Sequence, residues 1–432
     1  MPSDVAVAEV PLPFNLDDIR TQGWFSRLVE RALDRPQWLM APLRRFFPIA
    51  RLPYFGVTAV ARYDDVQEVL SHDRIFDVPW KQQVRDLNEG RTFLLGMDID
   101  QEHRRLQRDL MKVFRHDDVA SIVTPRSAAF SEAIVENALQ AGGRLEAIEG
   151  LITLVPTRIC EEYFGIAVTD SDSFEERRAF AHWMLAMSTF TFGNPRDNPR
   201  FRAAGTAAAQ RVRALVDRRI AEAKARPDPG DSVLGRLVTL QRENPAVDDV
   251  TIRTWLIGMM TGFVPTNTMA AGRALEVLLR EPSFLAECQK AAQAGDDERL
   301  WRCLRETMRF MPIFLGAQRI CRQDYVLAEG TPRATMIKAG QLVVASTWSA
   351  MFDATRIVEP YAFNPDRPAS SYMLFGFGPH ACLGVLIAQA QILQTMKALL
   401  RRPGLRRAPG KDGRLEWLGQ FPGKLVVQID RV

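Results

Sequence analysis

The chain has 432 residues, of which 47% are hydrophobic and 25% are charged. That length allows about one to three domains, and the composition excludes a disordered or collagen-like chain. Lys and Arg number 56 against 52 Asp and Glu, a net charge of +4. This balance gives little support for a nucleic-acid binder, which would concentrate basic charge.

The sequence indicates a protein of a reducing compartment. It has no apolar run of about 18 residues, so no transmembrane helix is expected. The N-terminus lacks a basic stretch followed by an apolar one, so no signal peptide is expected. Five scattered cysteines argue against a disulfide framework. We therefore expect a cytoplasmic globular protein with no membrane or nucleic-acid partner, and a monomer by default.

Most of the chain shows the apolar spacing of helices. A linker-like stretch, KARPDPGD at 224–231, is short and has periodic sequence on both sides. Strand-like runs are fewer than helical ones, so the fold class is mainly α with minor β (α+β) in one large domain. Helices are predicted over 130–139, 207–223, 233–240 and 385–400, and strands over 56–62, 325–327, 341–346 and 424–429.

One stretch, FGFGPHACLG at 375–384, combines a cysteine with glycines and a proline. Such a composition excludes regular helix or strand and predicts a shaped loop before the helix at 385. A Cys382 thiolate would gain there from the helix dipole and from backbone N–H groups aimed at its sulfur. These features suit an axial haem ligand. From the residues alone, a structural cysteine or a redox thiol stays equally open, whereas buried core positions are expected for Cys160, Cys288, Cys303 and Cys321.

The same stretch resembles the haem-binding signature of the cytochrome P450 family, F-x-x-G-x-[HR]-x-C-x-G, at every fixed position. The resemblance implies that Cys382 ligates the iron of haem b. It also implies that Phe375 packs against the ligand side and that His380 contacts a haem propionate. The cofactor-binding loop would include Gly376, Gly378 and Gly384.

Further landmarks follow in the family's order. Glu306 and Arg309 resemble its E-x-x-R motif, whose spacing puts both charges on one helix face. In the family an arginine, here Arg367 of a Pro-Asp-Arg segment, completes a buried triad. Arg319 resembles the arginine that reaches a propionate, and His103 lies in a segment like the family's C helix. We therefore expect a P450 haem domain at 51–432 after an N-terminal segment at 1–50.

Residues 255–279 are expected to form the long helix that crosses the distal haem face. The family usually carries [AG]-G-x-[DE]-T there, where an acid and an alcohol help deliver protons. An ungapped count places Gly262 on the first position and Thr266 on the alcohol, so that Pro265 replaces the acid and Phe263 the second glycine. A proline inside a helix removes an N–H, frees carbonyls and kinks the axis. A shift of one residue would instead put Pro265 on the alcohol.

A second departure lies four residues after His103. Many members carry a propionate-binding arginine there, whereas this chain has Gln107, followed by Arg108. One position along a helix turns a side chain by about 100°. The basic residues of this segment form either a solvated face or a docking patch for an acidic ferredoxin or flavodoxin, and they are Arg104, Arg105, Arg108 and Lys112.

The resemblance implies a haem-thiolate monooxygenase that takes O2 and, from separate proteins, electrons of NAD(P)H. Because Pro265 replaces the acid, proton delivery would fall to Thr266, Asn267, a substrate hydroxyl or water. The alternative is a member that uses peroxide or no redox partner: a peroxygenase, or an isomerase or dehydratase of a hydroperoxide. A third hypothesis is a haem-binding sensor or carrier without turnover.

The substrate pocket is placed by analogy in segments rich in Phe, Trp, Met and Leu. They favour a small-to-medium apolar substrate of more than a few carbons, although core packing is the commoner role for any single residue. Lys81 and Arg85 are candidates to anchor a substrate carboxylate. The substrate-contact candidates are Leu256, Phe263, Phe314 and Phe421, and the pocket segments are 78–97, 182–201, 257–266, 312–317 and 417–421.

Overall fold

The computed structural model describes residues 36–52, 56–193 and 197–431, so the predicted segment 1–50 lies mostly outside the described residues. Helices dominate the described part of the chain, as predicted. Their bounds are α2 Pro36–Phe46, α3 Tyr63–Ser71, α4 Lys81–Leu87, α5 Gln101–Val113, α6 Thr124–Gln140, α7 Leu154–Glu162, α8 Phe174–Phe192, α9 Pro199–Ala225, α10 Val233–Glu243, α11 Asp249–Arg280, α12 Pro282–Gln293, α13 Asp297–Phe310, α14 Thr347–Ala350 and α15 Val385–Leu400.

The strands are short and form four small sheets. The largest has the order β1-β2-β8-β5-β3, in which only β2 and β8 run parallel. The others are β4-β12-β9, β10-β11 and β6-β7. The bounds are β1 Ile49–Leu52, β2 Val57–Val60, β3 Phe76–Asp77, β4 Arg144–Glu146, β5 Ala317–Cys321, β6 Tyr325–Leu327, β7 Thr335–Ile337, β8 Leu342–Ala345, β9 Arg406–Arg407, β10 Glu416–Leu418, β11 Phe421–Lys424 and β12 Val426–Gln428.

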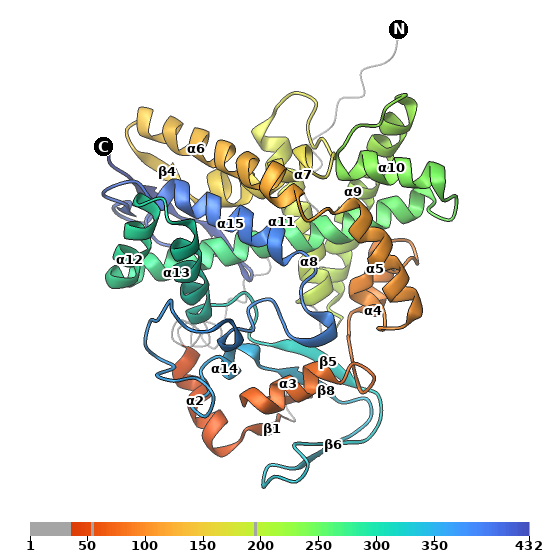
Figure 1. Cartoon of the computed structure of the whole chain (residues 1–432), viewed down its shortest axis with the longest axis vertical. Coiled ribbons are helices and arrows are strands. Elements are labelled where there is room, and N and C mark those ends of the chain that lie inside the picture. The colour runs from red at the N-terminus through yellow and green to blue at the C-terminus, as the bar shows by residue number, and fades with distance from the viewer. Residues whose placement is uncertain (1–35, 53–55, 194–196, 432) are drawn as a thin grey trace.

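Helix α11 is the central element of the helical part, which Figure 1 shows above the five-stranded sheet and its helices α2, α3 and α14. Its N-terminus is capped by Asp248, whose side chain accepts from the Thr251 N–H at 2.7 Å. This cap starts the helix six residues before the predicted 255. The N-terminal half packs in one hydrophobic cluster with α7 to α10, and the C-terminal half in a second cluster with α6, α12, α13 and α15.

The predicted strand at 424–429 is wrong as a continuous element. Its first residue, Lys424, ends β11, which pairs with β10, whereas β12 pairs with β4 and β9. The chain changes sheets at Leu425, whose N–H donates to the Glu146 carboxylate at 3.0 Å. The Glu146 side chain, at the end of β4, thus accepts the Leu425 N–H and separates β11 from β12 within the predicted strand 424–429.

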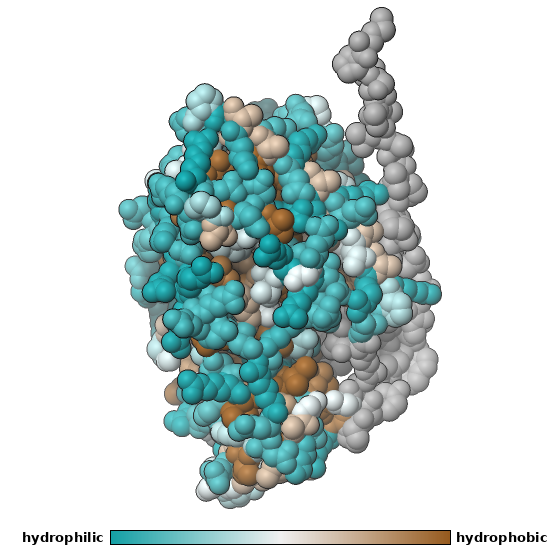
Figure 2. Space-filling view, turned by 90° about the vertical axis from the view of Figure 1, so that its right-hand side faces the viewer, coloured by the Kyte–Doolittle hydropathy of each residue, from teal (hydrophilic) through white to brown (hydrophobic). Residues whose placement is uncertain are grey.

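The molecular surface agrees with the composition. On the face drawn in Figure 2, hydrophilic residues predominate and hydrophobic ones form small scattered groups. None of the helices in the described ranges is long and apolar enough to cross a membrane. All five cysteines are free thiols.

Candidate haem site

The loop at 375–384 takes a shape that requires two of its glycines. Gly376 and Gly378 have φ angles of +79° and +75°, in the left-handed region that L side chains rarely adopt. A Cβ on Gly378 would also lie 2.3 Å from the Leu70 carbonyl oxygen. The Cys382 N–H donates to the Phe375 carbonyl at 2.9 Å, and this hydrogen bond closes the loop. Helix α15 begins three residues later, at Val385.

Cys382 differs from the other cysteines in its surroundings. Its side chain is exposed, whereas Cys160, Cys288, Cys303 and Cys321 are buried. Desolvation by the surrounding protein raises the pKa of the Cys382 thiol, and a hydrogen bond from the Gly384 backbone N–H lowers it. The sulfur therefore has accessible surface within a largely protein-lined setting, beside a helix N-terminus. This is the geometry that a ligand-binding sulfur needs.

His103, His380 and Arg319 converge from three different elements. The rings of His103 on α5 and His380 in the loop lie 6.4 Å apart between centroids. Burial lowers the pKa of His380 to about 4, assisted by the charges of Arg319 and His103. Burial also lowers the pKa of Arg319, on β5, to about 10, against the opposing charge of Asp77. The Arg319 guanidinium donates to the Gln318 carbonyl at 2.8 Å, and no described carboxylate lies within ion-pair distance of it.

Glu306, Arg309 and Arg367 form a buried triad, as predicted. Arg309 donates to both Glu306 carboxylate oxygens, at 2.6 and 2.9 Å, and Arg367 Nε donates to one of them at 3.1 Å. Burial alone would raise the pKa of Glu306, but the hydrogen bond and charge of Arg309 outweigh it and lower the pKa. A further partner, Tyr372, was not predicted, and its hydroxyl donates to the Glu306 carboxylate at 2.9 Å.

Comparison with known proteins decides the family. The family described as Cytochrome P450 matches residues 44–416. The chain belongs to the cytochrome P450 family. Among the curated relatives is a mycinamicin IV hydroxylase/epoxidase of Micromonospora griseorubida. The two chains are 25% identical over 370 residues, and the alignment covers 83% of this chain and 86% of the relative.

Two further comparisons agree with this assignment. The chain is 26% identical over 385 residues to a nocardicin C N-oxygenase of Nocardia uniformis subsp. tsuyamanensis, covering 85% of this chain and 88% of the relative. Its fold resembles that of a cytochrome P450 from Chondromyces apiculatus, with a TM-score of 0.74 and 20% identity over 93% of this chain and 97% of that one. The predicted fold and the predicted enzyme class, a cytochrome P450 monooxygenase, are confirmed.

The residues of this P450 fit the haem that the family implies. The accessible thiol of Cys382 can supply the iron ligand, as described above. Nδ1 of His103 is buried and has no acceptor or donor among the described residues. Together with Arg319 and His380, it forms a donor-rich group whose side chains make no ion pair with a described carboxylate, although Asp77 is near enough to affect the pKa of Arg319 and His380. Such a group suits the two propionates of a haem. In α11, a Cβ built on Gly262 would meet no atom within 4 Å, so a flat group can approach the backbone there.

The alcohol and the proline of α11 have distinct local roles. Thr266 Oγ1 donates to the Gly262 carbonyl, with a longer contact of 3.4 Å to the Phe263 carbonyl. Pro265 is buried and lies inside a helix that continues on both sides. Because proline has no N–H, the Thr261 carbonyl lacks its usual helical donor. The hydroxyl proton of Thr266 is thus committed to the helix backbone, which leaves its lone pairs available as acceptors.

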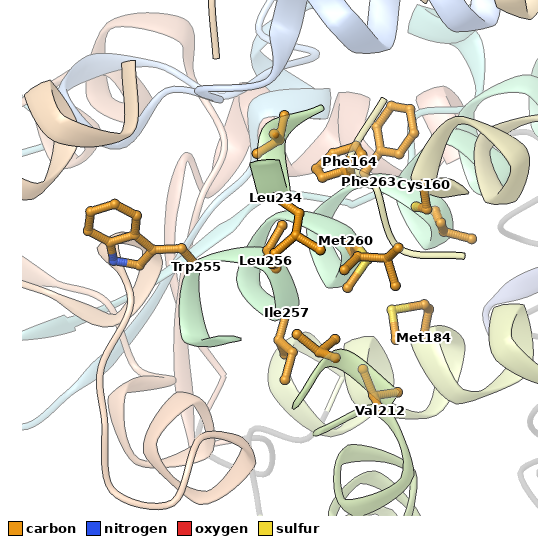
Figure 3. Close-up of a cluster of buried hydrophobic side chains, with 14 of the residues drawn as sticks. Cys160, Phe164, Met184, Val212, Leu234, Trp255, Leu256, Ile257, Met260 and Phe263 are labelled. Carbon is orange, nitrogen blue, oxygen red and sulfur yellow. The ribbon is translucent and has the colours of Figure 1, made fainter. Parts of the chain in front are cut away.

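The four predicted substrate-contact residues fall into two separate hydrophobic clusters. Leu256 and Phe263 pack in the core shown in Figure 3, where the Phe263 ring lies 5.7 Å from that of Phe164. Phe314 and Phe421 pack together in a second, smaller cluster. This second cluster joins the segment after α13 to the β10–β11 hairpin and lies beside the C-terminal half of α11.

The basic segment of α5 is exposed, whereas Gln107 is half-buried. Lys112 pairs with Asp109 at 2.7 Å, so it is not a free cation. Arg104, Arg105 and Arg108 have no ion pair with another residue of the described part. A cavity of about 160 Å³ lies against this helix, lined among others by Arg105 and Trp255. Its lining also includes Arg91 and Thr92 of the predicted pocket segment 78–97, but none of the residues predicted to bind haem.

The predicted carboxylate anchors have different surroundings. Lys81 pairs with Asp77 at 2.6 Å and Asp98 at 2.5 Å, so its charge is already compensated. Arg85 is exposed. A half-buried arginine that sequence reasoning missed, Arg273, lies on α11 between the two segments that carry Phe314 and Phe421. A single charge within the otherwise apolar and uncharged run 261–275 was the signal that could have identified it.

Proposed function

We propose that this P450 holds haem b through Cys382 and hydroxylates or epoxidises a small-to-medium apolar substrate, using O2 and electrons from a separate ferredoxin or flavodoxin system. A haem held by a thiolate supplies oxygen activation when it is bound. Coordination to iron would keep the Cys382 sulfur deprotonated despite its raised thiol pKa. His103, His380 and Arg319 would hold the propionates, and Phe375, Gly376, Gly378 and Gly384 would shape the loop beneath.

The hydroxyl of Thr266 is the observation that carries the choice of a monooxygenase. Its proton points to the Gly262 carbonyl, so its oxygen can accept a hydrogen bond on the distal side and orient a proton donor there. Asn267, whose buried Nδ2 has no partner among the described residues, is the neighbouring donor in α11. Without an acid at 265, water or a substrate hydroxyl would complete the proton path.

The absence of a carboxylate at Pro265 supports a second candidate, a peroxide-using or redox-partner-free member. Peroxide already carries the electrons and protons that the monooxygenase reaction must import, so the acid would be dispensable. The exposed arginines of α5 support the first candidate, because a basic face can steer an acidic electron donor. The free cysteines support a reducing cytoplasmic location, and we propose a monomer.

Product formation under two oxidant regimes tests the proposal. The haem-loaded protein receives either NADPH with a surrogate ferredoxin system or hydrogen peroxide alone, with a panel of apolar substrates including a lipid hydroperoxide. The monooxygenase gives product only with the electron chain. Thr266→Ala should then consume NADPH with about tenfold less product per electron, in line with the loss of one proton-transfer group. Product with peroxide alone, unaffected by Thr266→Ala, supports the second candidate, and no product in either regime favours a sensor or carrier.

Substrate contacts follow from the two clusters. We propose that Phe314 and Phe421 form an apolar wall next to α11, with Phe263 and Leu256 behind it in the core. Alanine at Phe314 should weaken binding of an apolar substrate, whereas Leu256→Ala should mainly destabilise the fold because it removes a fully buried side chain.

A further inference from the structure

Arg273 lies on the same face of α11 as Thr266. The two residues are seven positions apart, so their side chains differ in direction by about 20° and lie roughly 10 Å apart along the axis. Its surroundings are apolar: Met269 of the same helix packs with Leu185 and Phe421 in the small cluster described above. Arg273 is therefore a cation at the edge of the apolar wall, along the helix that carries the predicted alcohol.

The guanidinium of Arg273 bridges two segments that are far apart in sequence. Nη1 donates to the Pro312 carbonyl after α13, and Nη2 donates to the Gln420 carbonyl in the β10–β11 hairpin at 2.9 Å. Its Cζ lies 5.5 Å from the centroid of the Trp417 ring. Both segments are ones that the sequence places at the substrate pocket. Arg273 therefore joins two pocket segments to α11.

The donors of Arg273 exceed the acceptors that the described residues offer. A guanidinium has five N–H donors, and the bonds to Pro312 and Gln420 use two of them. Nε is buried and has no acceptor among the described residues. The side-chain Nε2 of Gln420, next to the carbonyl that Arg273 contacts, is also buried without one. An unpaired buried donor is destabilising, and more so when it is charged.

Several buried arginines among the described residues pair with carboxylates, whereas Arg44 and Arg319 do not. Arg236 pairs with Asp118 at 2.5 Å, Arg219 with Asp170 at 2.5 Å, and Arg309 with Glu306 at 2.6 Å. Desolvation lowers the pKa of Arg273 to about 10, and the same holds for Arg319. Arg319 lies where haem carboxylates are expected. Arg273 has the same electrostatic character at a second place, beside the apolar wall.

We propose that Arg273, with the side-chain amide of Gln420, binds the carboxylate of an apolar carboxylic acid substrate. A carboxylate satisfies the free guanidinium donors in the bidentate geometry that arginine prefers, and the apolar cluster accepts the rest of the molecule. Arg273 as a whole residue is half-buried, and its Nε is buried. This inference rests on the proposed function, because it names the substrate class of that site.

Binding of matched acids and esters to the haem-loaded full-length protein tests the inference. The probes are fatty acids and aryl-alkanoic acids, each compared with its methyl ester. Binding is measured by calorimetry and by the substrate-induced shift of the haem absorption band. We expect the acid to bind at least about tenfold more tightly than its ester, which corresponds to 1.4 kcal/mol. Arg273→Met should remove that preference and leave ester binding within about twofold.

Gln420→Ala separates a binding role from a structural one. Arg273 contacts the Gln420 backbone carbonyl, which alanine retains, so the junction of the two segments stays intact. This variant should weaken acid binding severalfold at an unchanged melting temperature. Equal binding of acid and ester by the wild type overturns the inference. An affinity loss in Arg273→Met that is equal for acid and ester also overturns it. The absence of any acid binding at millimolar concentration would overturn it too.

The failure of this inference and that of the proposed function give different results. If acids bind through Arg273 in calorimetry but no probe is oxidised in the electron-driven assay, the anchor stands and the monooxygenase fails. If neutral esters are bound and oxidised as well as the acids, the monooxygenase stands and the anchor fails.

Discussion

The His103 ring meets the His380 ring nearly edge to face, at an interplanar angle of 77° and a centroid distance of 6.4 Å. Two imidazoles and the Arg319 guanidinium thus lie close together, and the nearby charges of Asp73 and Asp77 only partly offset the lowering of the pKa of His380. Protonation of His380 is disfavoured there, first by burial and then by the charge of Arg319. The site therefore favours binding of a negatively charged group.

The pKa of His380 predicts an acid sensitivity that haem should relieve. The folded pKa, about 4, lies below the usual value of 6.5, so the unfolded chain binds an extra proton between these pH values. Stability should therefore fall as the pH drops from about 6.5 to 4, by about 1–2 kcal/mol after allowance for screening. Haem propionates would raise the pKa and reduce the loss.

Urea unfolding of haem-free and haem-loaded protein across this pH range measures the effect. His380→Gln should remove most of the difference between the two forms, whereas His116→Gln, at an exposed position, should retain it. Identical pH dependence with and without haem would contradict the assignment of His380 to the propionate site.

The buried triad predicts a large loss of stability when its acid is neutralised. Glu306→Gln leaves the buried charges of Arg309 and Arg367 without their carboxylate, and the free energy of unfolding should fall by about 3–5 kcal/mol. Arg302→Gln, which breaks an exposed pair with Glu298 on the same helix, should change stability far less, because solvent screens an exposed pair. Chemical denaturation of both variants checks the prediction, and similar losses would mean that the triad is not the stabilising unit.

Gly378 predicts a backbone requirement in the loop before Cys382. Gly378→Ala meets both a positive φ angle and the Leu70 carbonyl at 2.3 Å, so we expect a loss of at least about 2 kcal/mol and weakened haem retention. Gly150→Ala is the control, because its Cβ would make only ordinary contacts, at 3.8 Å or more, and it lies outside the haem loop. If the two variants retain haem equally well, the loop does not depend on Gly378.

Sequence reasoning reached the loop, the triad and the long helix because each follows from local signals. The Cys382 loop matches five fixed positions within ten consecutive residues, and Glu306 and Arg309 are one helical turn apart. The pairing of Tyr372 with Glu306, or of Arg273 with the Pro312 and Gln420 carbonyls, depends on segments brought together only by the fold. The same holds for the packing of the Phe263 ring on Phe164.

Reduction of the haem-loaded protein with dithionite under carbon monoxide tests the central claim, that Cys382 is the thiolate ligand of a P450 haem. The wild type should show the red-shifted carbonyl band that gives the family its name. Cys382→Ala should abolish it, and Cys160→Ala, at a cysteine buried in the core, should leave it unchanged. A haem-loaded wild type without the band, or a band that persists in Cys382→Ala, would contradict the ligand assignment and the proposed chemistry with it.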